Sequence, residues 1–235
     1  MAIMSASPSA VALDDKIYCF FQGSGDSGEL WYVIWNGEHW ETKRQVPRTG
    51  ITAGPSAVVF DNKIYCFHQG SSNNGELWYN VLNEGRWEGD KQVPRTGISA
   101  EPSAVVFDNK IYCFHQGSSN SGELWYNIFS AQGWEGDRRV HGTFLSAGPS
   151  AVNVLSDQIY CFHQGSGNNG ELWYNVFSRN GWSGDQRVPG SSMSAGPSAV
   201  FFVRTIYCFY QGSGNSGALW YNTLIDRNWA GQRQV

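Results

Sequence analysis

The sequence contains one segment five times, and this internal repeat constrains the fold more than any other feature. The segment IYCFHQGSSNNGELWYN begins at Ile64, and near-copies begin at Ile17, Ile111, Ile159 and Ile206. Each copy carries one cysteine at the same place, and these cysteines follow one another at intervals of 47, 47, 48 and 47 residues. A period of about 47 residues is typical of propeller blades or of helical arrays.

A proline opens each copy in the segment PSAV and marks the boundaries of the repeats. The repeats run approximately over 8–54, 55–101, 102–148, 149–196 and 197–235. Residues 1–7 precede the first proline, and we expect them to complete the ring. The chain is therefore predicted to be a single domain over residues 1–235.

The pattern within one repeat distinguishes blades from helices. In the second copy four runs of β-forming residues alternate with turn-forming residues such as Asp61-Asn62. These runs are PSAVVF (55–60), KIYCFHQ (63–69), ELWYNVL (76–82) and RWEGDKQV (86–93). No segment keeps the 3.6-residue period of a helix. The sequence predicts an all-β, closed, five-bladed β-propeller with four antiparallel strands per blade. PSAV is expected innermost, RWEGDKQV outermost, and the segment from Pro94 onward is expected to connect the blades.

Composition and charge narrow the class of partner. The formal net charge is −4 and no stripe of basic residues is present, so we expect no nucleic-acid partner. No apolar run approaches the roughly 20 residues that span a bilayer, which predicts no membrane insertion. The N-terminal segment lacks the features of a signal peptide, which indicates cytoplasmic synthesis and, for any release, a route without a signal. The sequence does not indicate an oligomeric state.

The cysteines are predicted to be unpaired and buried, and no metal or cofactor is expected. There are five, an odd number, at Cys19, Cys66, Cys113, Cys161 and Cys208. Equivalent positions on different blades lie too far apart for a disulfide. We therefore interpret each cysteine as a small, buried, apolar side chain that packs once in every blade.

The third strand of each repeat carries side chains suited to binding a sugar. Since side chains alternate along a strand, Glu76, Trp78 and Asn80 should share one face. An indole can cover the C–H groups of a pyranose, and a carboxylate can accept charge-assisted hydrogen bonds from neighbouring hydroxyls. The indole alternatively packs between blades. The equivalent candidates are Glu29, Trp31, Glu123, Trp125, Asn127, Glu171, Trp173 and Asn175.

Two further sets of aromatic residues are candidates for the same site. His68, His115 and His163 share one position in the second strand, where Phe21 and Tyr210 stand in the outer copies. This replacement indicates packing or stacking, and not metal ligation or base catalysis. Trp87, Trp134 and Trp182 begin the fourth strand and either pack the blade or form the wall of a site between blades. Asp90, Asp137 and Asp185 follow three residues later, and we interpret them as turn or cap residues.

The order PSAV, NKIYCF, QG, GELWYN, GW.GD resembles the repeats of fucose-binding propeller lectins of fungi and bacteria. Five blades of about 47 residues are instead similar to tachylectin-type lectins, which bind N-acetylhexosamines. Many fucose binders carry an arginine in the second strand, where every copy here has Ile-Tyr. The resemblance implies a multivalent carbohydrate-binding lectin whose partners are glycans on glycoproteins or cell surfaces, and both sugar classes stay open.

Two other functions are weighed against this one. A glycoside hydrolase needs two carboxylates with different roles at one site, whereas here the carboxylates are copied in register. A scaffold that binds protein should vary from blade to blade, whereas here even the loops are copied. We therefore expect a non-catalytic protein with four sites, since Ala218 replaces the glutamate in the fifth copy.

Overall fold

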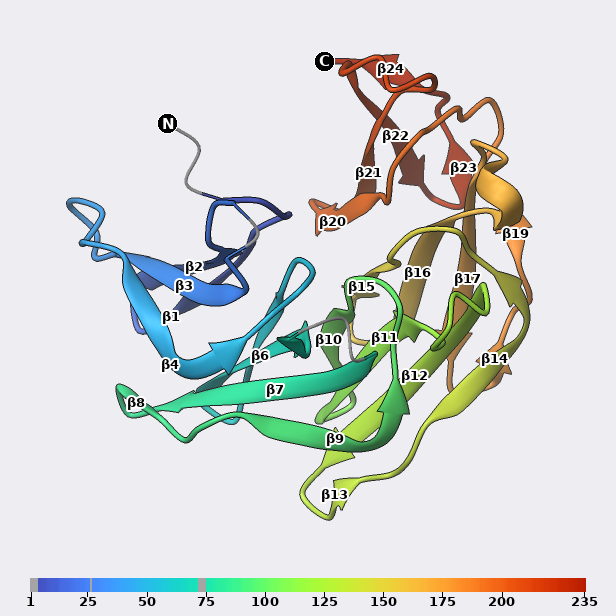
Figure 1. The fold of residues 1–235 in the computed structure, drawn as a ribbon. Coiled ribbons are helices and arrows are strands. Elements are labelled where there is room, and N and C mark those ends of the chain that lie inside the picture. Colours follow the sequence, from blue (N-terminus) through green and yellow to red (C-terminus); the bar gives the residue numbers. More distant parts are fainter. Residues whose placement is uncertain (1–3, 26, 72–74) are drawn as a thin grey trace.

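The computed structural model describes residues 4–25, 27–71 and 75–235 and has the predicted all-β architecture. Five antiparallel sheets follow one another around a central axis in chain order, from the blue first blade to the red fifth blade (Figure 1). The prediction of five blades with four strands each is confirmed.

The strands divide into one set per repeat. Blade 1 holds β1 (Ser9–Leu13), β2 (Lys16–Gln22), β3 (Glu29–Trp35) and β4 (Arg44–Gly50). Blade 2 holds β5 (Ser56–Phe60), β6 (Lys63–Gln69), β7 (Glu76–Asn83), β8 (Arg86–Trp87) and β9 (Lys91–Gly97). Blade 3 holds β10 (Ser103–Phe107), β11 (Lys110–Gln116), β12 (Glu123–Ser130), β13 (Gly133–Trp134) and β14 (Arg138–Phe144). Blade 4 holds β15 (Ser150–Val154), β16 (Gln158–Gln164), β17 (Leu172–Ser178), β18 (Gly181–Trp182) and β19 (Gln186–Arg187), with a short 3-10 turn, η2 (Ser166–Asn168). Blade 5 holds β20 (Ser198–Phe202), β21 (Thr205–Gln211), β22 (Leu219–Ile225), β23 (Asn228–Trp229) and β24 (Arg233–Gln234).

The inner strands are the PSAV segments, as predicted. Consecutive inner strands lie side by side around the axis, and the hydroxyl of a serine on one accepts a hydrogen bond from the next. The Ala57 amide donates to Ser9 Oγ at 2.9 Å, and this contact recurs at the next three interfaces with the same length. The first two strands of blade 2 meet in a two-residue turn at Asp61 and Asn62, both in the left-handed region with φ of 50° and 55°. Such a turn matches the twist of a β-hairpin.

The outer edge differs from the prediction. It consists of a two-residue strand such as β8 and a longer strand such as β9, and both pair with the third strand of the blade. The strand β9 extends past Pro94 to Gly97, a segment that the sequence assigned to a connection; Gln92 pairs with Trp78 and Gly97 with Glu76, and the register shifts between these two pairs. Proline is tolerated here because an edge strand needs no inward N–H at that position.

The hydrophobic core lies between blades. Trp134 packs edge-on against Phe67 and Tyr79 of the preceding blade, with ring centroids 5.9 and 5.5 Å apart. Trp87, Trp182 and Trp229 pack in the same way on the blade before them. Each tryptophan therefore joins two blades, which explains why the residue recurs once per repeat.

The predicted closure between the first and fifth blades is wrong. The two blades lie apart in Figure 1, and the described residues include no serine-to-amide bond between β20 and β1. Trp40, which should pack on the fifth blade, is 52% exposed, and Phe202 on the facing side is 63% exposed. We call this gap the seam.

Residues 4 and 5 lie along the first blade. Met4 forms a β-bridge with Gly23, and the Ser5 amide donates to the carbonyl of Gln22, so this segment pairs with the first blade. The angle between blades that leaves the seam open depends on packing along every interface, which a repeat pattern alone does not encode.

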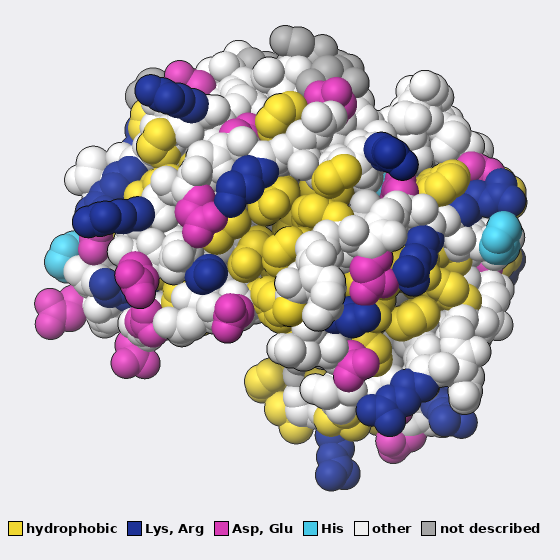
Figure 2. All heavy atoms as spheres, turned by 90° about the horizontal axis from the view of Figure 1, so that it is seen from below, with side chains coloured by type: hydrophobic (Ala, Val, Ile, Leu, Met, Phe, Trp, Pro, Cys, Tyr) yellow, Lys and Arg dark blue, Asp and Glu magenta, His cyan; other side chains and the backbone are white. Residues whose placement is uncertain are grey.

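The surface carries scattered charge of both signs. In Figure 2 hydrophobic side chains gather in the middle of the face, and Lys, Arg, Asp and Glu surround them without forming a patch of one sign. Within the described residues, no helix has the length and apolar character needed to cross a membrane.

Candidate functional site

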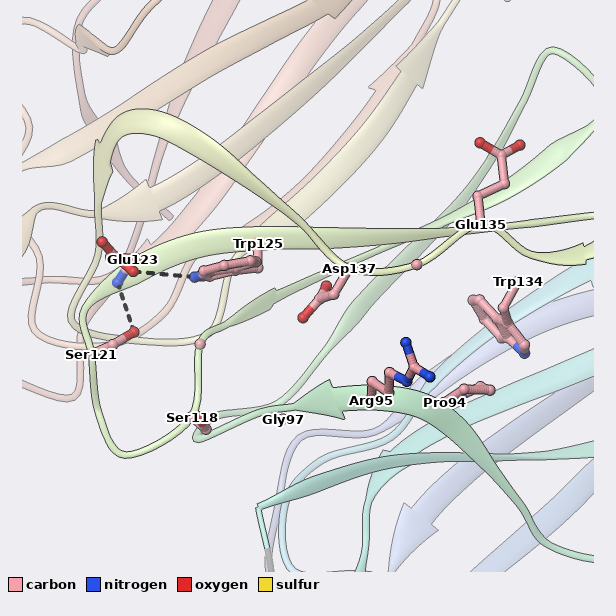
Figure 3. A pocket seen from close by; sticks show the side chains of 12 residues that line it. Pro94, Arg95, Gly97, Ser118, Ser121, Glu123, Trp125, Trp134, Glu135 and Asp137 are labelled. Atoms are coloured by element: carbon pink, nitrogen blue, oxygen red, sulfur yellow. Dashed lines mark hydrogen bonds between the residues drawn. The ribbon is translucent and has the colours of Figure 1, made fainter.

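A pocket with a volume of about 820 Å³ lies between blades 2 and 3. Blade 2 contributes Arg95 and Gly97 from β9. Blade 3 contributes Glu123 and Trp125 from the start of β12, and Asp137 from the segment after β13 (Figure 3). One blade alone cannot form this pocket, because its walls come from two sheets.

Glu123 and Trp125 share one face of β12, as the strand alternation predicts. The Trp125 indole Nε1 donates to Glu123 Oε2 at 3.3 Å, and Arg139 Nη1 donates to Glu123 Oε1 at 2.8 Å. Both carboxylate oxygens are thus fixed at the pocket wall. The same Trp-to-Glu bond joins Trp31 to Glu29, Trp78 to Glu76 and Trp173 to Glu171 at 3.0, 3.2 and 3.2 Å.

The predicted contact of the histidines with a ligand is not available in this conformation. His115 is 0% exposed, and its imidazole lies between the carbonyl of Gln116 and Asp137 Oδ1, at 3.2 and 2.9 Å. His68 and His163 are equally buried and contact Asp90 and Asp185 at 2.9 Å. The histidines therefore position the aspartates, and Asp137 lines the pocket where the sequence suggested only a turn residue.

The asparagines, which the sequence placed at the site, are also buried and do not reach a ligand in the pocket. Asn127 is 0% exposed, and its amide donates to Thr96 Oγ1 of blade 2 at 2.8 Å. Asn80 and Asn175 make the same bond to Thr49 and Thr143. A buried amide that joins two blades fixes the distance between the walls of the pocket but does not touch its contents.

Trp134 both packs between blades and forms part of the pocket wall, the two roles that the sequence left open for it. Its ring packs on the preceding blade, and its edge lines the pocket. The indole Nε1 is buried and has no hydrogen-bond partner in the described part of the chain, as is also true of Trp87 and Trp182. Its ring contacts with Phe67, Tyr79 and Phe129 place it between two sheets, so it serves the fold as well as the pocket.

Arg95 is a site residue that sequence reasoning missed. Its side chain extends from β9 into the pocket on the side of Asp137 (Figure 3). The backbone of Arg95 is left-handed, with φ of 55°, and Arg48 has the same φ at the equivalent position of blade 1. Glycine occupies this position at Gly142 and Gly190. An arginine held where glycine fits better indicates that the guanidinium serves a purpose other than stability. The repeated segment VPRTG was the available signal.

The site changes around the ring. Between blades 3 and 4 a pocket of about 400 Å³ contains Trp173 and Asp185, and Arg187 Nη1 donates to Glu171 at 2.8 Å. Gly142 replaces the arginine of β9 there.

At the interface between blades 4 and 5, and at the seam, the set of pocket residues is incomplete. Blade 5 has Ala218 and Gln232 in place of the glutamate and aspartate. Glu29 and Trp31 of blade 1 face the seam, where Lys43 lies 4.7 Å from the Trp31 ring.

The blade 2 site has Glu76, Trp78 and the His68–Asp90 pair opposite Arg48. Its loop residues 72–74 lie outside the described residues.

Comparisons with known proteins support the fold. No protein-family model matches the chain, and no curated protein matches it. A lectin from Aleuria aurantia, described as a six-bladed β-propeller with a novel fucose recognition mode, superposes with a TM-score of 0.75 at 15% identity, covering 99% of this chain and 80% of that one. A triple arginine-to-alanine mutant of AofleA from Arthrobotrys oligospora gives a TM-score of 0.74 at 14% identity, covering 100% and 73%. An α-L-arabinofuranosidase from Clostridium thermocellum gives 0.62 at 14% identity, covering 98% and 94%. These identities are low, so the likeness shows the fold alone, a β-propeller of the kind found in these solved structures.

Proposed function

We propose that this protein is a non-catalytic lectin that binds monosaccharide units of glycans in the pockets between its blades. The observation that carries the proposal is the pocket of about 820 Å³, where a cation, two fixed carboxylates and an indole meet. Arg95 can donate to ring or hydroxyl oxygens, and Glu123 and Asp137 can accept from hydroxyls. Trp125 offers an apolar surface for the C–H groups of a pyranose.

Three interfaces have the glutamate, the tryptophan and the His–Asp pair together: those between blades 1 and 2, 2 and 3, and 3 and 4. We therefore propose three sites per chain, one fewer than the sequence suggested, since Glu29 lies at the seam without a preceding blade. Several weak sites on one rigid body can raise avidity by about 10²–10⁴ on a surface that displays many glycans. The partners are glycans of glycoproteins or cell surfaces.

Glycoside hydrolysis is the second candidate, because one solved structure with this fold is an α-L-arabinofuranosidase. Such catalysis needs a proton donor on one carboxyl group and a base or nucleophile on the other. Glu123 accepts hydrogen bonds from Trp125 and Arg139, and Asp137 contacts His115. Both carboxyl groups are used as acceptors, which favours binding over proton donation.

Titration calorimetry with L-fucose and with N-acetyl-D-glucosamine tests the proposal. We expect one of these sugars to bind at about three sites per chain. The double variant Arg48→Gly and Arg95→Gly should weaken two of the three sites, while the site opposite Gly142 stays unchanged. Glycine suits the left-handed φ at both positions, so the variant should fold at least as well as the parent.

Two results would count against the proposal. Binding of either sugar with unaltered affinity and stoichiometry in the Arg-to-Gly variant would remove Arg95 from the site. Release of reducing sugar from an arabinofuranoside, lost on Glu123→Gln, would instead support the hydrolase.

A further inference from the structure

A second pocket lies between blades 4 and 5, away from the sites described above. Its volume is about 470 Å³, within the range of roughly 300–1,000 Å³ that is usual for small-molecule sites. Tyr160 and Tyr174 form one wall, and Ser178 marks the end of β17. Since Glu171 precedes β17 and Ser178 ends it, this pocket and the proposed lectin site lie at opposite ends of the same strand.

The tyrosines of this pocket face a smaller side chain than the equivalent tyrosine of blade 3. In blade 3 the Tyr112 ring is covered by Phe177 of the next blade, with ring centroids 5.5 Å apart. The residue of blade 5 at the position of Phe177 is Leu224, which lies against blade 4 and lines the pocket. The stacked rings of Tyr160 and Tyr174, 6.0 Å apart, therefore present a surface that leucine covers only in part.

The rim of this pocket lacks the ion pairs that stand at its equivalent in blade 3. There Glu135 accepts from Lys110 at 2.8 Å and from Arg138 at 2.9 Å. The corresponding residues of blade 4 are Gln158, Ser183 and Gln186, and all three line the pocket. Gln186 links the rim to the wall, since it donates to Ser183 Oγ at 3.2 Å and accepts from the Tyr174 hydroxyl at 2.8 Å. Amides and hydroxyls at the rim suit a hydroxylated ligand.

Arg227 gives the pocket its charge. It is the single ionised side chain among the residues lining the pocket, and it forms no ion pair or side-chain hydrogen bond with any residue that the structure describes. It stands in a two-residue turn with φ of 66°, where asparagine or glycine is the usual choice. Burial raises the pKa of the Tyr160 hydroxyl, and the charge of Arg227 acts in the opposite direction. Arg227 lines the same pocket as Tyr160 and Tyr174, so its guanidinium can act on a ligand held there.

We propose that this pocket is a second binding site, specific for a monosaccharide-sized sugar acid. The tyrosine wall covers the apolar face of the ring, the amides and serine hydroxyls of the rim bind its hydroxyls, and Arg227 pairs with its carboxylate. The site is independent of the proposed lectin sites, since its lining shares no residue with the pocket between blades 3 and 4.

A nuclear magnetic resonance titration with sodium D-glucuronate, and separately with D-glucose, tests this site. Glucuronate should shift the amide signals of residues 226–228 and of Ser183, and glucose should bind at least tenfold more weakly. Arg227→Asn keeps a residue suited to the turn and should lower the affinity for glucuronate to that for glucose. Leu224→Phe places the equivalent of Phe177 in the pocket and should abolish both.

A second variant covers the case in which Leu224→Phe does not fold. Gln158→Lys with Ser183→Glu and Gln186→Arg transfers the ion pairs of blade 3 to the rim and should also block binding. Glu123→Gln with Glu171→Gln should leave glucuronate binding unchanged, which separates this site from the lectin sites. Equal affinity for both sugars, shifts confined to the Glu123 pocket, or no shifts with millimolar glucuronate would each overturn the proposal.

Discussion

His115 and Asp137 meet at 2.9 Å, and their contact connects a fully buried imidazole to the wall of the pocket between blades 2 and 3. The two residues change together around the ring. Blade 1 has Phe21 and Lys43 at these positions, and blade 5 has Tyr210 and Gln232, whose hydroxyl and amide oxygen lie 3.3 Å apart. The pair therefore acts as a unit that holds a carboxylate in place.

Replacing all three paired histidines by phenylalanine should weaken sugar binding and keep the fold, because phenylalanine already stands there in blade 1. Without the imidazole, Asp137 and its equivalents lose their fixed position, and a charge-assisted bond to sugar should lose about 1.5–3 kcal/mol. Calorimetric titration of His68→Phe, His115→Phe and His163→Phe in one chain measures this loss. Tyr210→Phe is the matched control, since blade 5 lacks the glutamate, and it should leave affinity unchanged. Unaltered affinity in the triple variant would show that the aspartates do not contact sugar.

Trp134 and Trp40 occupy equivalent positions with different surroundings. Trp134 packs on two rings of the preceding blade, whereas Trp40 lies beside the seam and is 52% exposed. Trp134→Ala should therefore lower the free energy of unfolding by about 3 kcal/mol or more, and Trp40→Ala by less than about 1 kcal/mol. Urea unfolding of the two variants gives the comparison. Equal losses would mean that the seam is closed in solution.

Cys19 should react first with a thiol reagent in the folded protein. The other four cysteines are fully buried, and burial raises the pKa of their thiols far above the ordinary value. Cys19 faces the seam and is half-buried, so burial raises its pKa less. Titration with a disulfide reagent should find one fast thiol, and four more after denaturation. If no thiol reacted quickly in the folded protein, the result would contradict the open seam.

Glu101 should make stability depend on pH. It replaces a glycine of the repeat, and a methyl group on Gly54 or Gly148 would lie 2.8 or 2.5 Å from its side chain, so Glu101 fills the space between these glycines. Burial raises the pKa of its carboxyl group above the ordinary 4.5. Stability contributed by the neutral form is present below the unfolded-state pKa and is lost as pH rises through the higher folded-state pKa.

Glu101→Gln removes this titration. The variant should gain stability over the parent at about pH 7 and show little difference at about pH 4. Urea unfolding at both pH values measures the change, and Glu84→Gln, in an exposed turn, is the control. A difference between parent and variant that is the same at both pH values would contradict burial of the carboxyl group.

The repeat made most of the fold predictable. PSAV, IYCF and ELWYN each encode a strand, and alternation along ELWYN correctly placed Glu76 and Trp78 on one face, because strand geometry is local. The joint loss of histidine and aspartate in the outer copies was a usable sign of their contact. Because the histidines were interpreted as packing residues and the aspartates as turn residues, the contact between them was not predicted.

Features that depend on two blades were harder to predict. Arg95 reaches a pocket whose other wall includes Glu123 and Asp137, which follow it by 28 and 42 residues in the chain, and a single blade gives no indication of what its neighbour contributes. The burial of Asn127 depends on Thr96 of the preceding blade. The seam depends on the angle between successive sheets, which no short motif specifies.

The central claim is that the glutamates of blades 2, 3 and 4 hold sugar hydroxyls in pockets between blades. A glycan array probed with the parent protein and with the triple variant Glu76→Gln, Glu123→Gln and Glu171→Gln tests it most directly, with circular dichroism to verify the fold. We predict that the parent binds a defined set of glycans and that the folded triple variant binds none of them above background. Undiminished binding of the same glycans by the triple variant would contradict the account.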